Sequence, residues 1–407
     1  MTDVVKGTGT EPPGQAPVPP GDRGSGGFKR RSRVILVVLC LVVVAAVLIA
    51  VGVGGSGSAG HPSVVKTISL VSPSYTPKAA VGATDDYHCT LLNPHVAKDS
   101  YVISSQFHPG SSEDHHAVLA LVPPSLAATA LHDDAATGGK GWTCFGAPSL
   151  PNASLVQFLS TPFLSIWAPG HGADALPKDT GIALPAQSLV IEQVHYNLLV
   201  GDKPVKNTLT LDTVPSSTPL LPLHLDLTLA PPDVPCPAGV TGALCDRAAS
   251  LAEQGRVFGQ QEVEIVDGIE AVCGHDASNP PASDTASCSW KVQKSGYIVR
   301  AQAHMHLLGS SFTMVLNPGT PQARTVLSVP QYNFDYQKAY NLSTPIPVAA
   351  GDRLQVNCTY NPRLAQELPL LRQAPPHYVT WGDGSTDEMC IGLAWTSATV
   401  PNARDTL

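Results

Sequence analysis

The chain has 407 residues and a formal net charge of −8, with 24 Lys and Arg against 32 Asp and Glu. This length excludes a disulfide-stapled miniprotein, and the acidic balance disfavours a nucleic-acid-binding protein, which needs a basic surface. Only 14% of the residues are charged and 43% are hydrophobic. Part of that apolar excess lies in one segment near the N-terminus, so the composition of the rest of the chain is less apolar than these values suggest.

The first 33 residues are rich in Pro and Gly and contain almost no large apolar side chains. Such a segment cannot bury enough surface to offset the entropy lost on ordering, so residues 1–33 are predicted to be a disordered tail. The tail is net basic, which leaves the remainder of the chain more acidic than the whole. An anionic partner is therefore not expected for that remainder.

Residues 34–53 form an apolar run without a charge. Its length matches the roughly 20 residues that a helix needs to cross a bilayer core. Basic residues precede the run and neutral GGSGSAG follows it. The positive-inside rule therefore predicts a single-pass transmembrane helix in the cell membrane, with the N-terminus cytoplasmic and the bulk of the chain extracytoplasmic. The alternative is a cleaved signal peptide, because Ser58-Ala59-Gly60 resembles a cleavage site, although the apolar region of such a peptide is shorter.

Nine cysteines occur, of which Cys40 lies in the apolar run and eight follow it. An even number in an oxidising compartment favours up to four disulfides. Closeness in sequence predicts the pairs Cys236–Cys245 and Cys273–Cys288. Neither pair has the CxxC spacing of a zinc or redox site, which favours structural disulfides.

The chain after the apolar run is predicted to be all-β. Short segments rich in β-branched and aromatic residues alternate with clusters of Pro, Gly, Asp and Asn, which is typical of β-sandwiches. Strands are predicted at residues 100–107, 115–122, 188–200, 208–214, 223–230, 262–268, 296–308, 324–329 and 352–361. The only convincing helix is predicted at residues 246–258.

Two domains are predicted, because about 350 residues exceed what one core usually supports. A Pro- and Ser-rich break at 214–219 lies near the middle of this part of the chain and marks the boundary. The predicted organisation is a linker over 54–75, a first domain over 76–217 and a second over 218–407. Residues 231–290, with four cysteines and the predicted helix, form an apparent insertion in the second domain.

Histidines in the predicted strands are the candidate functional residues. In the strand at 296–308, alternation places Tyr297, Val299, Ala301, Ala303, Met305 and Leu307 on an apolar face that needs a core. His304 and His306 lie side by side on the other face, close enough to chelate one metal ion. Met305 is then a core residue and not a ligand. Alternate histidines also occur on solvated sheet faces, so this pair alone does not decide between the two interpretations.

His115 and His116 are adjacent, so they point to opposite faces of a regular strand and can share one ion only at a strand end or bulge. His195 lies in a strand with no clearly buried side and is either a hydrogen-bonded core residue or a ligand. Near the C-terminus, Met389 stands between acidic residues and Cys390. Its thioether is a soft ligand that suits copper.

The pieces DHHAVLAL, QVHYN, AHMHLLG, GDRLQVNCTYN and STDEMC occur in an order and spacing that resembles the copper type II ascorbate-dependent monooxygenases. This is the family of dopamine β-hydroxylase and peptidylglycine α-hydroxylating monooxygenase, and the resemblance spans roughly residues 80 to 400. It implies two jelly-roll-like β-sandwich domains that face each other across a solvent-filled cleft, each with one copper ion. It also implies disulfides Cys89–Cys144 and Cys358–Cys390.

By matching motifs, His115, His116 and His195 would hold an electron-transfer copper, and His304, His306 and Met389 an oxygen-activating copper at the catalytic site. The implied activity is hydroxylation of a C–H bond of a small-molecule substrate, with O2 and a reductant such as ascorbate. The peptide-amidating branch uses an Arg and a Tyr to hold a peptide carboxylate, and Gln302 and Leu393 stand at those positions here. Gln302 is therefore a candidate substrate-binding residue, and peptide amidation is not expected.

Two other functions compete with this interpretation. The first is a copper-binding surface protein that kept the fold and ligands but lost substrate turnover. The second is an adhesion or scaffold β-sandwich whose histidines are incidental.

Overall fold

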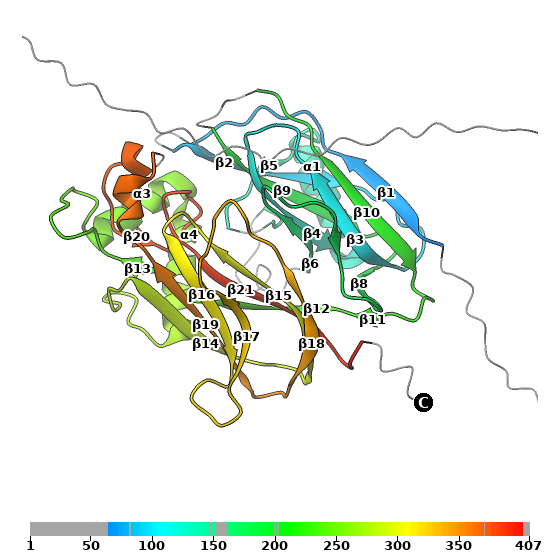
Figure 1. Ribbon diagram of the computed structural model, residues 1–407. Coiled ribbons are helices and arrows are strands. Elements are labelled where there is room, and N and C mark those ends of the chain that lie inside the picture. Colours follow the sequence, from blue (N-terminus) through cyan, green and yellow to red (C-terminus); the bar gives the residue numbers. More distant parts are fainter. Residues whose placement is uncertain are drawn as a thin grey trace, which may run out of the picture. The chain divides into compact units, whose positions relative to one another are not determined.

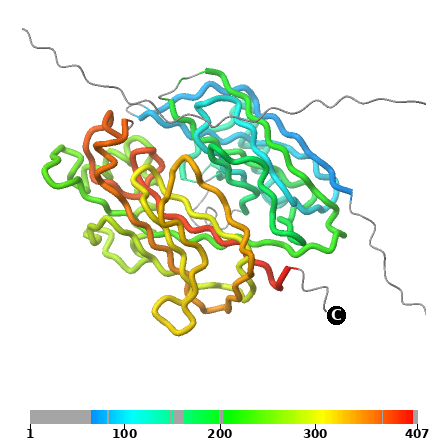
Figure 2. Tube along the Cα trace, in the orientation of Figure 1, coloured from blue at the N-terminus to red at the C-terminus, as the bar shows by residue number. Residues whose placement is uncertain are grey.

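The computed structural model describes residues 64–80, 83–146, 148–151, 162–198, 201, 203–369 and 371–401, and strands dominate this part of the chain (Figure 1). Four of the five sheets in the described residues form two pairs, one pair in each half of the described sequence, and the fifth has only two strands. Both halves belong to one compact unit. Figure 2 shows the first half in blue to green and the second in green to red.

The first half consists of a six-stranded and a five-stranded sheet. The six-stranded sheet has the order β1 (Lys66–Val71), β10 (Thr208–Pro215), β3 (Ser100–His108), β8 (Thr180–Leu184) and β11 (Leu221–Pro222), with β7 (Asp174–Ala175) paired to β3. The five-stranded sheet has the order β5 (Trp142–Thr143), β2 (Asp85–Leu92), β9 (Leu189–Asn197), β4 (Asp114–Val122) and β6 (Phe163–Trp167). Apolar residues of both sheets, among them Leu119, Leu184 and Leu209, share one core. Alternating inward-facing residues of two sheets form such a core in a β-sandwich.

The second half repeats this arrangement with two four-stranded sheets. One has the order β12 (His224–Leu229), β21 (Cys390–Ser397), β15 (Gly296–Met305) and β18 (Tyr340–Val348). The other has the order β14 (Thr285–Lys291), β19 (Arg353–Tyr360), β16 (Gly309–Leu316) and β17 (Arg324–Val329). Met305, Phe312 and Met314 are fully buried in the core of this half, which confirms Met305 as a core residue.

Short helices occur in the connections between strands. They are α1 (Pro124–Ala136), α3 (Arg247–Phe258), α4 (Gln260–Cys273), the short α5 (Leu364–Glu367) and a 3₁₀ turn at Leu371–Gln373. The helix predicted at 246–258 is confirmed as α3, and Asp246 caps it by accepting a hydrogen bond from Ala249 N. β13 (Asp233–Val234), which precedes α3, pairs with β20 (Val379–Thr380), which precedes β21, and the two form a two-stranded sheet.

Three sequence predictions about these elements are wrong. Residues 262–268, predicted as a strand, lie inside α4, because Ile265, Val266 and Ile269 are spaced to bury one helical face. Helix α1 was not predicted, since its alanine-rich sequence has little apolar periodicity and buries only Ala130. Strand β1 lies inside the predicted 54–75 linker and pairs with β10 along its whole length.

All four predicted disulfides are present: Cys89–Cys144, Cys236–Cys245, Cys273–Cys288 and Cys358–Cys390. The predicted tail, the apolar run at 34–53 and Cys40 lie outside the described residues. Within the described ranges, no helix combines the length and apolar character that crossing a membrane requires.

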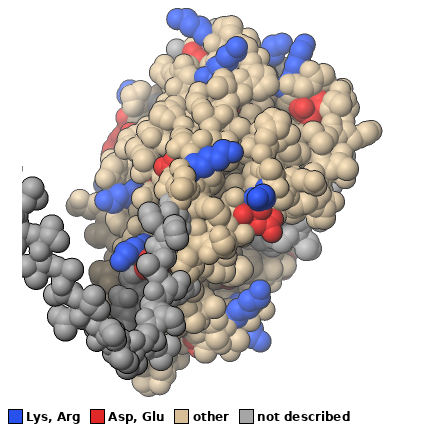
Figure 3. All heavy atoms as spheres, turned by 90° about the vertical axis from the view of Figure 1, so that its right-hand side faces the viewer, with Lys and Arg blue, Asp and Glu red and all other residues tan. Residues whose placement is uncertain are grey.

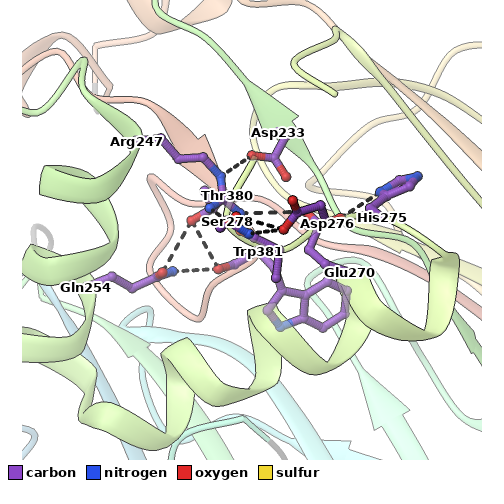
Figure 4. A network of polar contacts seen from close by, with 10 residues as sticks. Asp233, Arg247, Gln254, Glu270, His275, Asp276, Ser278, Thr380 and Trp381 are labelled. Carbon is purple, nitrogen blue, oxygen red and sulfur yellow. Dashed lines mark hydrogen bonds and ion pairs between the residues drawn. The ribbon is translucent and has the colours of Figure 1, made fainter. Parts of the chain in front are cut away.

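A buried polar network fastens α3 and α4 to the β13–β20 sheet (Figure 4). Gln254 of α3 bonds to the main chain at Trp381, and Arg247 donates to the Asp233 carboxylate. Glu270 of α4 accepts a hydrogen bond from His275 Nδ1. Through Gln254, helix α3 therefore contacts the chain at Trp381, immediately before the loop at 382–389. Because β14 is part of a sheet, the segment outside the sandwich is shorter than the predicted 231–290 insertion.

Candidate metal centre

The three histidines of the first half lie together where β4 and β9 pair. The register shifts between Asp114 and His116, so that His116 pairs with His195 and the strand bulges at His115. This is the bulge that two adjacent histidines need in order to face one site. The ring centroids are 5.1 Å apart for His115 and His195 and 4.7 Å apart for His116 and His195.

These imidazoles are held by hydrogen bonds. His195 Nδ1 lies 3.0 Å from His116 Nε2, and His195 Nε2 donates to Asp85 Oδ1 at 2.7 Å. Tyr87 stacks on the His195 ring, with centroids 4.1 Å apart. Burial lowers the pKa of His115 to about 3 and that of His116 well below its ordinary value. Both rings are therefore neutral near pH 7, and a neutral imidazole is the form that binds a metal ion.

The histidines of the second half lie at the end of β15. His304 Nδ1 donates to Gln337 Oε1 at 2.6 Å, and His306 Nδ1 donates to the carbonyl oxygen of Asp387 at 3.2 Å. Burial lowers the pKa of His304 to about 4 and that of His306 well below its ordinary value. In each ring the proton is thus on Nδ1 and the lone pair is on Nε2. A hydrogen bond to the other ring nitrogen commonly orients a histidine that binds a metal ion.

His306 Nε2 is buried and has no hydrogen-bond partner among the described residues. Buried polar atoms are nearly always paired, so an unpaired imidazole lone pair requires an explanation. A metal ion at this nitrogen would supply the missing partner. Neutral imidazoles are ligands that suit copper. Met389 lines the same pocket as His304 and packs in an apolar cluster with Ile265 and Trp381.

Met389 immediately precedes β21, whose Cys390 pairs with Met305 and whose Ile391 pairs with His304. This register brings Met389 opposite the His306 end of β15. The buried Glu388 carboxyl accepts the backbone N–H groups of His306, Leu308 and Met389. The Cys358–Cys390 disulfide tethers the neighbouring residue to β19. The backbone at Met389 is therefore held by the residue before it, Glu388, and by the disulfide of the residue after it, Cys390.

The β15 strand differs from the predicted alternation at its start. A register shift between Ile298 and Arg300 places Ile298 in the same core as Ala301 and Met305, and Val299 in the core of the other half. A bulge adds one residue and reverses the faces on one side of it. From Ala301 onward the predicted apolar face is correct.

The two predicted metal sites lie next to each other, which corrects the expected separation by a solvent-filled cleft. The ring centroids of His116 and His304 are 5.7 Å apart. Direct hydrogen bonds join the halves around them: Tyr87 Oη to the Asp383 carbonyl, Ser385 Oγ to Asp85 Oδ1, and Arg300 Nη2 to Asp174 Oδ1. Side chains from both halves therefore form a single cluster of five histidines.

The described ranges contain no group of three or more His, Cys, Asp and Glu side chains arranged to hold a metal ion. In the first half, the hydrogen bond between His116 and His195 occupies nitrogen atoms that a metal ion would need. The second half supplies only two such side chains and a thioether. The proposed ligand roles of all six residues thus remain predictions.

A narrow cleft with about 70 Å³ of water-accessible volume lies beside the cluster. His116, His304, Met389 and Gln302 line it, and most of the other lining residues are apolar, including Phe163, Ile166, Trp167, Ile391 and Leu393. Asp383 is the only charged residue among the described lining residues. The described lining therefore offers no Lys or Arg side chain to a carboxylate ligand.

Sequence reasoning missed the supporting residues Asp85, Gln337 and Glu388. Glu388 directly precedes the predicted ligand Met389, and its position was a usable signal. Asp85 and Gln337 carry no such signal, because each is brought to its histidine only by strand pairing or by a loop far away in sequence.

Residues 282–394 match the C-terminal domain of the copper type II ascorbate-dependent monooxygenases. The match to this copper monooxygenase domain includes His304, His306 and Met389, and it confirms the resemblance for this part of the chain. It supports oxidoreductase chemistry that depends on copper and ascorbate. The first half lies outside the matched segment.

A search of curated proteins finds no match in sequence. Among solved structures, the chain is similar to the major capsid protein P2 of Bacteriophage PM2, with 9% identity, a TM-score of 0.33, and coverage of 83% of this chain and 99% of that one. It is also similar to allantoicase (10% identity, TM-score 0.18, coverage 70% and 77%) and to a fucolectin from the striped bass Morone saxatilis (8% identity, TM-score 0.16, coverage 82% and 96%). Likeness at this level carries no argument about function.

Proposed function

We propose that this protein is a membrane-anchored, extracytoplasmic copper monooxygenase that hydroxylates a C–H bond of a small organic substrate. The reaction would also consume O2 and a one-electron reductant such as ascorbate. Two copper ions are proposed, one held by His115, His116 and His195 and one by His304, His306 and Met389. The observation that carries the proposal is the buried, unpaired Nε2 of His306, which lies with His304 in the cluster of five histidines, next to the chain that carries Met389.

Copper bound at these residues would supply the redox chemistry, because it is stable with imidazole and thioether ligands in one oxidation state and with nitrogen and oxygen ligands in the other. The chain contributes the orientation of the ligands. Gln337 and the Asp387 carbonyl hold the Nδ1 protons of His304 and His306, so that both Nε2 lone pairs are available at the β15 end.

The cleft next to His304 and Met389 is the proposed substrate site. Its apolar walls bind a hydrocarbon or aromatic portion, and the absence of Lys and Arg among its described lining residues disfavours a carboxylate substrate. Gln302 is nearly fully buried, and its amide nitrogen lies 3.5 Å from the Gln337 carbonyl, which leaves it only weakly engaged with the protein. We therefore propose Gln302 as the group that hydrogen-bonds a neutral polar part of the substrate.

The face of the molecule in Figure 3 shows only scattered Lys, Arg, Asp and Glu side chains on a largely uncharged surface. No cluster of basic groups is visible on it. This face therefore offers no electrostatic reason to propose a polyanionic partner in place of a small molecule.

Copper stoichiometry by elemental analysis tests the proposal on the purified full-length protein, after copper loading and dialysis. Two ions are expected in the wild type, with one retained in Met389→Ile and one in His195→Ala. His88→Ala is the matched control, because His88 is equally buried on β2 but bonds to the Lys140 carbonyl away from the cluster. It should retain two ions.

No retained copper in a folded wild type with intact disulfides would show that the histidines are structural. Two bound ions justify a substrate screen that follows O2 uptake with ascorbate. Copper binding without reductant-dependent O2 uptake across that screen would favour the copper-binding surface protein.

A further inference from the structure

Asp85 lies between the two halves and is almost fully buried. Its Oδ1 atom accepts two short hydrogen bonds, one from His195 Nε2 at 2.7 Å and one from Ser385 Oγ at 2.6 Å. Its Oδ2 atom accepts from the backbone nitrogen of Ser385 at 3.4 Å and from Thr84 Oγ1 at 3.2 Å. A single carboxylate therefore contacts a predicted ligand of the first half and a loop of the second half.

The contact with His195 determines where the imidazole proton lies. Both oxygen atoms of Asp85 accept hydrogen bonds from Ser385, and Oδ2 also accepts one from Thr84, so this carboxyl group has the surroundings of an acceptor. An ionised carboxylate can only accept hydrogen bonds. The proton of His195 is therefore on Nε2, and Nδ1 faces His116 at 3.0 Å.

The contact with Ser385 joins Asp85 to the second half of the chain. Ser385 is fully buried in the loop at 382–389, which ends at the predicted ligand Met389. Two further hydrogen bonds hold the same loop against the first half: Tyr87 Oη donates to the Asp383 carbonyl at 2.6 Å, and Gly146 N donates to the Asp383 carboxylate. Tyr87 also stacks on His195, so both residues that support this histidine also hold the loop.

We infer that Asp85 is a positioning residue shared by the two metal sites, which fixes the tautomer of His195 and links it through Ser385 to the loop that carries Met389. This inference rests on the proposed function, since it gives Asp85 a role toward the copper bound at His195. Loss of a group that hydrogen-bonds to a metal ligand typically weakens metal binding about 10- to 100-fold. Because hydrogen bonds join His195 through Asp85 to Ser385, copper binding at one site should also alter the copper affinity of the other site.

The first test uses the copper-free full-length protein and long-range ¹H–¹⁵N NMR of the histidine rings. In the wild type, the His195 signals should show the proton on Nε2, and Asp85→Asn should change this pattern. Asp86→Asn is the matched control, because Asp86 is the next residue on β2, is equally buried, and bonds to Tyr75 Oη and Lys78 N instead of a clustered histidine. An unchanged His195 pattern in folded Asp85→Asn would overturn the inference.

The second test measures copper affinity by competition with a chelator in a Met389→Ile background, where only the first site binds. Asp85→Asn should weaken this site about 10- to 100-fold, and Asp86→Asn should leave it unchanged. Equal affinity in Asp85→Asn and the background would overturn the inference. If the wild type binds no copper, the proposed function fails, and the NMR test still decides whether Asp85 positions His195.

The third test examines the link itself and removes only one hydroxyl group. In the wild-type chain, first-site affinity should differ from that in Met389→Ile. When both proteins also carry Ser385→Ala, this difference in first-site affinity should shrink. The His195 tautomer should stay unchanged, because Asp85 is still present. A difference as large in Ser385→Ala as in the wild type would overturn the link through Ser385. This variant also keeps the inference testable if Asp85→Asn does not fold.

Discussion

Gln337→Leu should weaken copper binding at the second site, because it removes the acceptor that orients His304. Gln337 is buried and makes two side-chain hydrogen bonds: Oε1 accepts from His304 Nδ1 at 2.6 Å and Nε2 donates to the Phe334 carbonyl at 2.8 Å. Leu is close to Gln in volume and makes neither bond. The substitution therefore changes the polar contacts with little change in packing.

The expected magnitude follows from these contacts. Two lost hydrogen bonds at about 1 kcal/mol each lower the free energy of unfolding by about 2 kcal/mol. The His304 Nδ1–H group is left buried without an acceptor, so the ring either rotates or moves its proton to Nε2. Both changes remove the lone pair from the metal-facing nitrogen, and copper affinity should fall about 10- to 100-fold.

The assay is a competition titration of copper in a His195→Ala background, with unfolding by urea to measure stability. Gln302→Leu is the matched control, because it makes the same change in the same cleft but Gln302 has no hydrogen bond to a histidine. Its copper affinity should be unchanged. If Gln337→Leu binds copper as tightly as the background while His304 keeps its proton on Nδ1, the reasoning about this contact is refuted.

Three further predictions concern stability. Burial raises the pKa of Glu192 to about 8, so the folded protein keeps a proton that the unfolded chain loses above its ordinary pKa. The free energy of unfolding should therefore fall between about pH 4.5 and pH 8, by up to about 1.4 kcal/mol per pH unit from this group; Glu192→Gln should flatten urea-unfolding stability against pH, and an unchanged slope would contradict it. Replacing Cys358 and Cys390 by Ser should cost about 2–5 kcal/mol and weaken copper retention at the second site, whereas the same change at the Cys236–Cys245 disulfide should affect stability alone. Gly141→Ala should lower the melting temperature more than Gly239→Ala, because both have positive φ but only at Gly141 would the new Cβ lie 2.1 Å from a backbone oxygen, that of Cys89; equal shifts would show that the clash relaxes.

Local sequence patterns were sufficient to predict most strands and the disulfides Cys236–Cys245 and Cys273–Cys288. The other two disulfides, Cys89–Cys144 and Cys358–Cys390, were predicted only from the resemblance to a known family. The strand at 188–200 follows from its β-branched and aromatic residues, which favour a strand locally. Asp246, the first residue of the predicted helix, caps α3. The same reasoning failed for residues 262–268, where an apolar run fits both a short strand and a helical face. Only packing against the sheet decides between these alternatives.

The sequence by itself determined which residues have metal-binding chemistry. The His-x-His pair, the adjacent histidines and Met389 next to a cysteine are readable without a structure, because the ligand type and its spacing are local properties. The bulge at His115 could also be anticipated, since two neighbouring side chains cannot otherwise share one face of a strand.

Only the tertiary structure decided how these residues are supported and how close the two sets lie. Asp85 reaches His195 across 110 positions of sequence, and Gln337 reaches His304 across 33. Ser385 meets Asp85 across 300 positions. Such contacts depend on strand pairing and on packing between the halves, so no local pattern encodes them. The distance between His116 and His304 depends on the same packing, because the two residues come from different sheets.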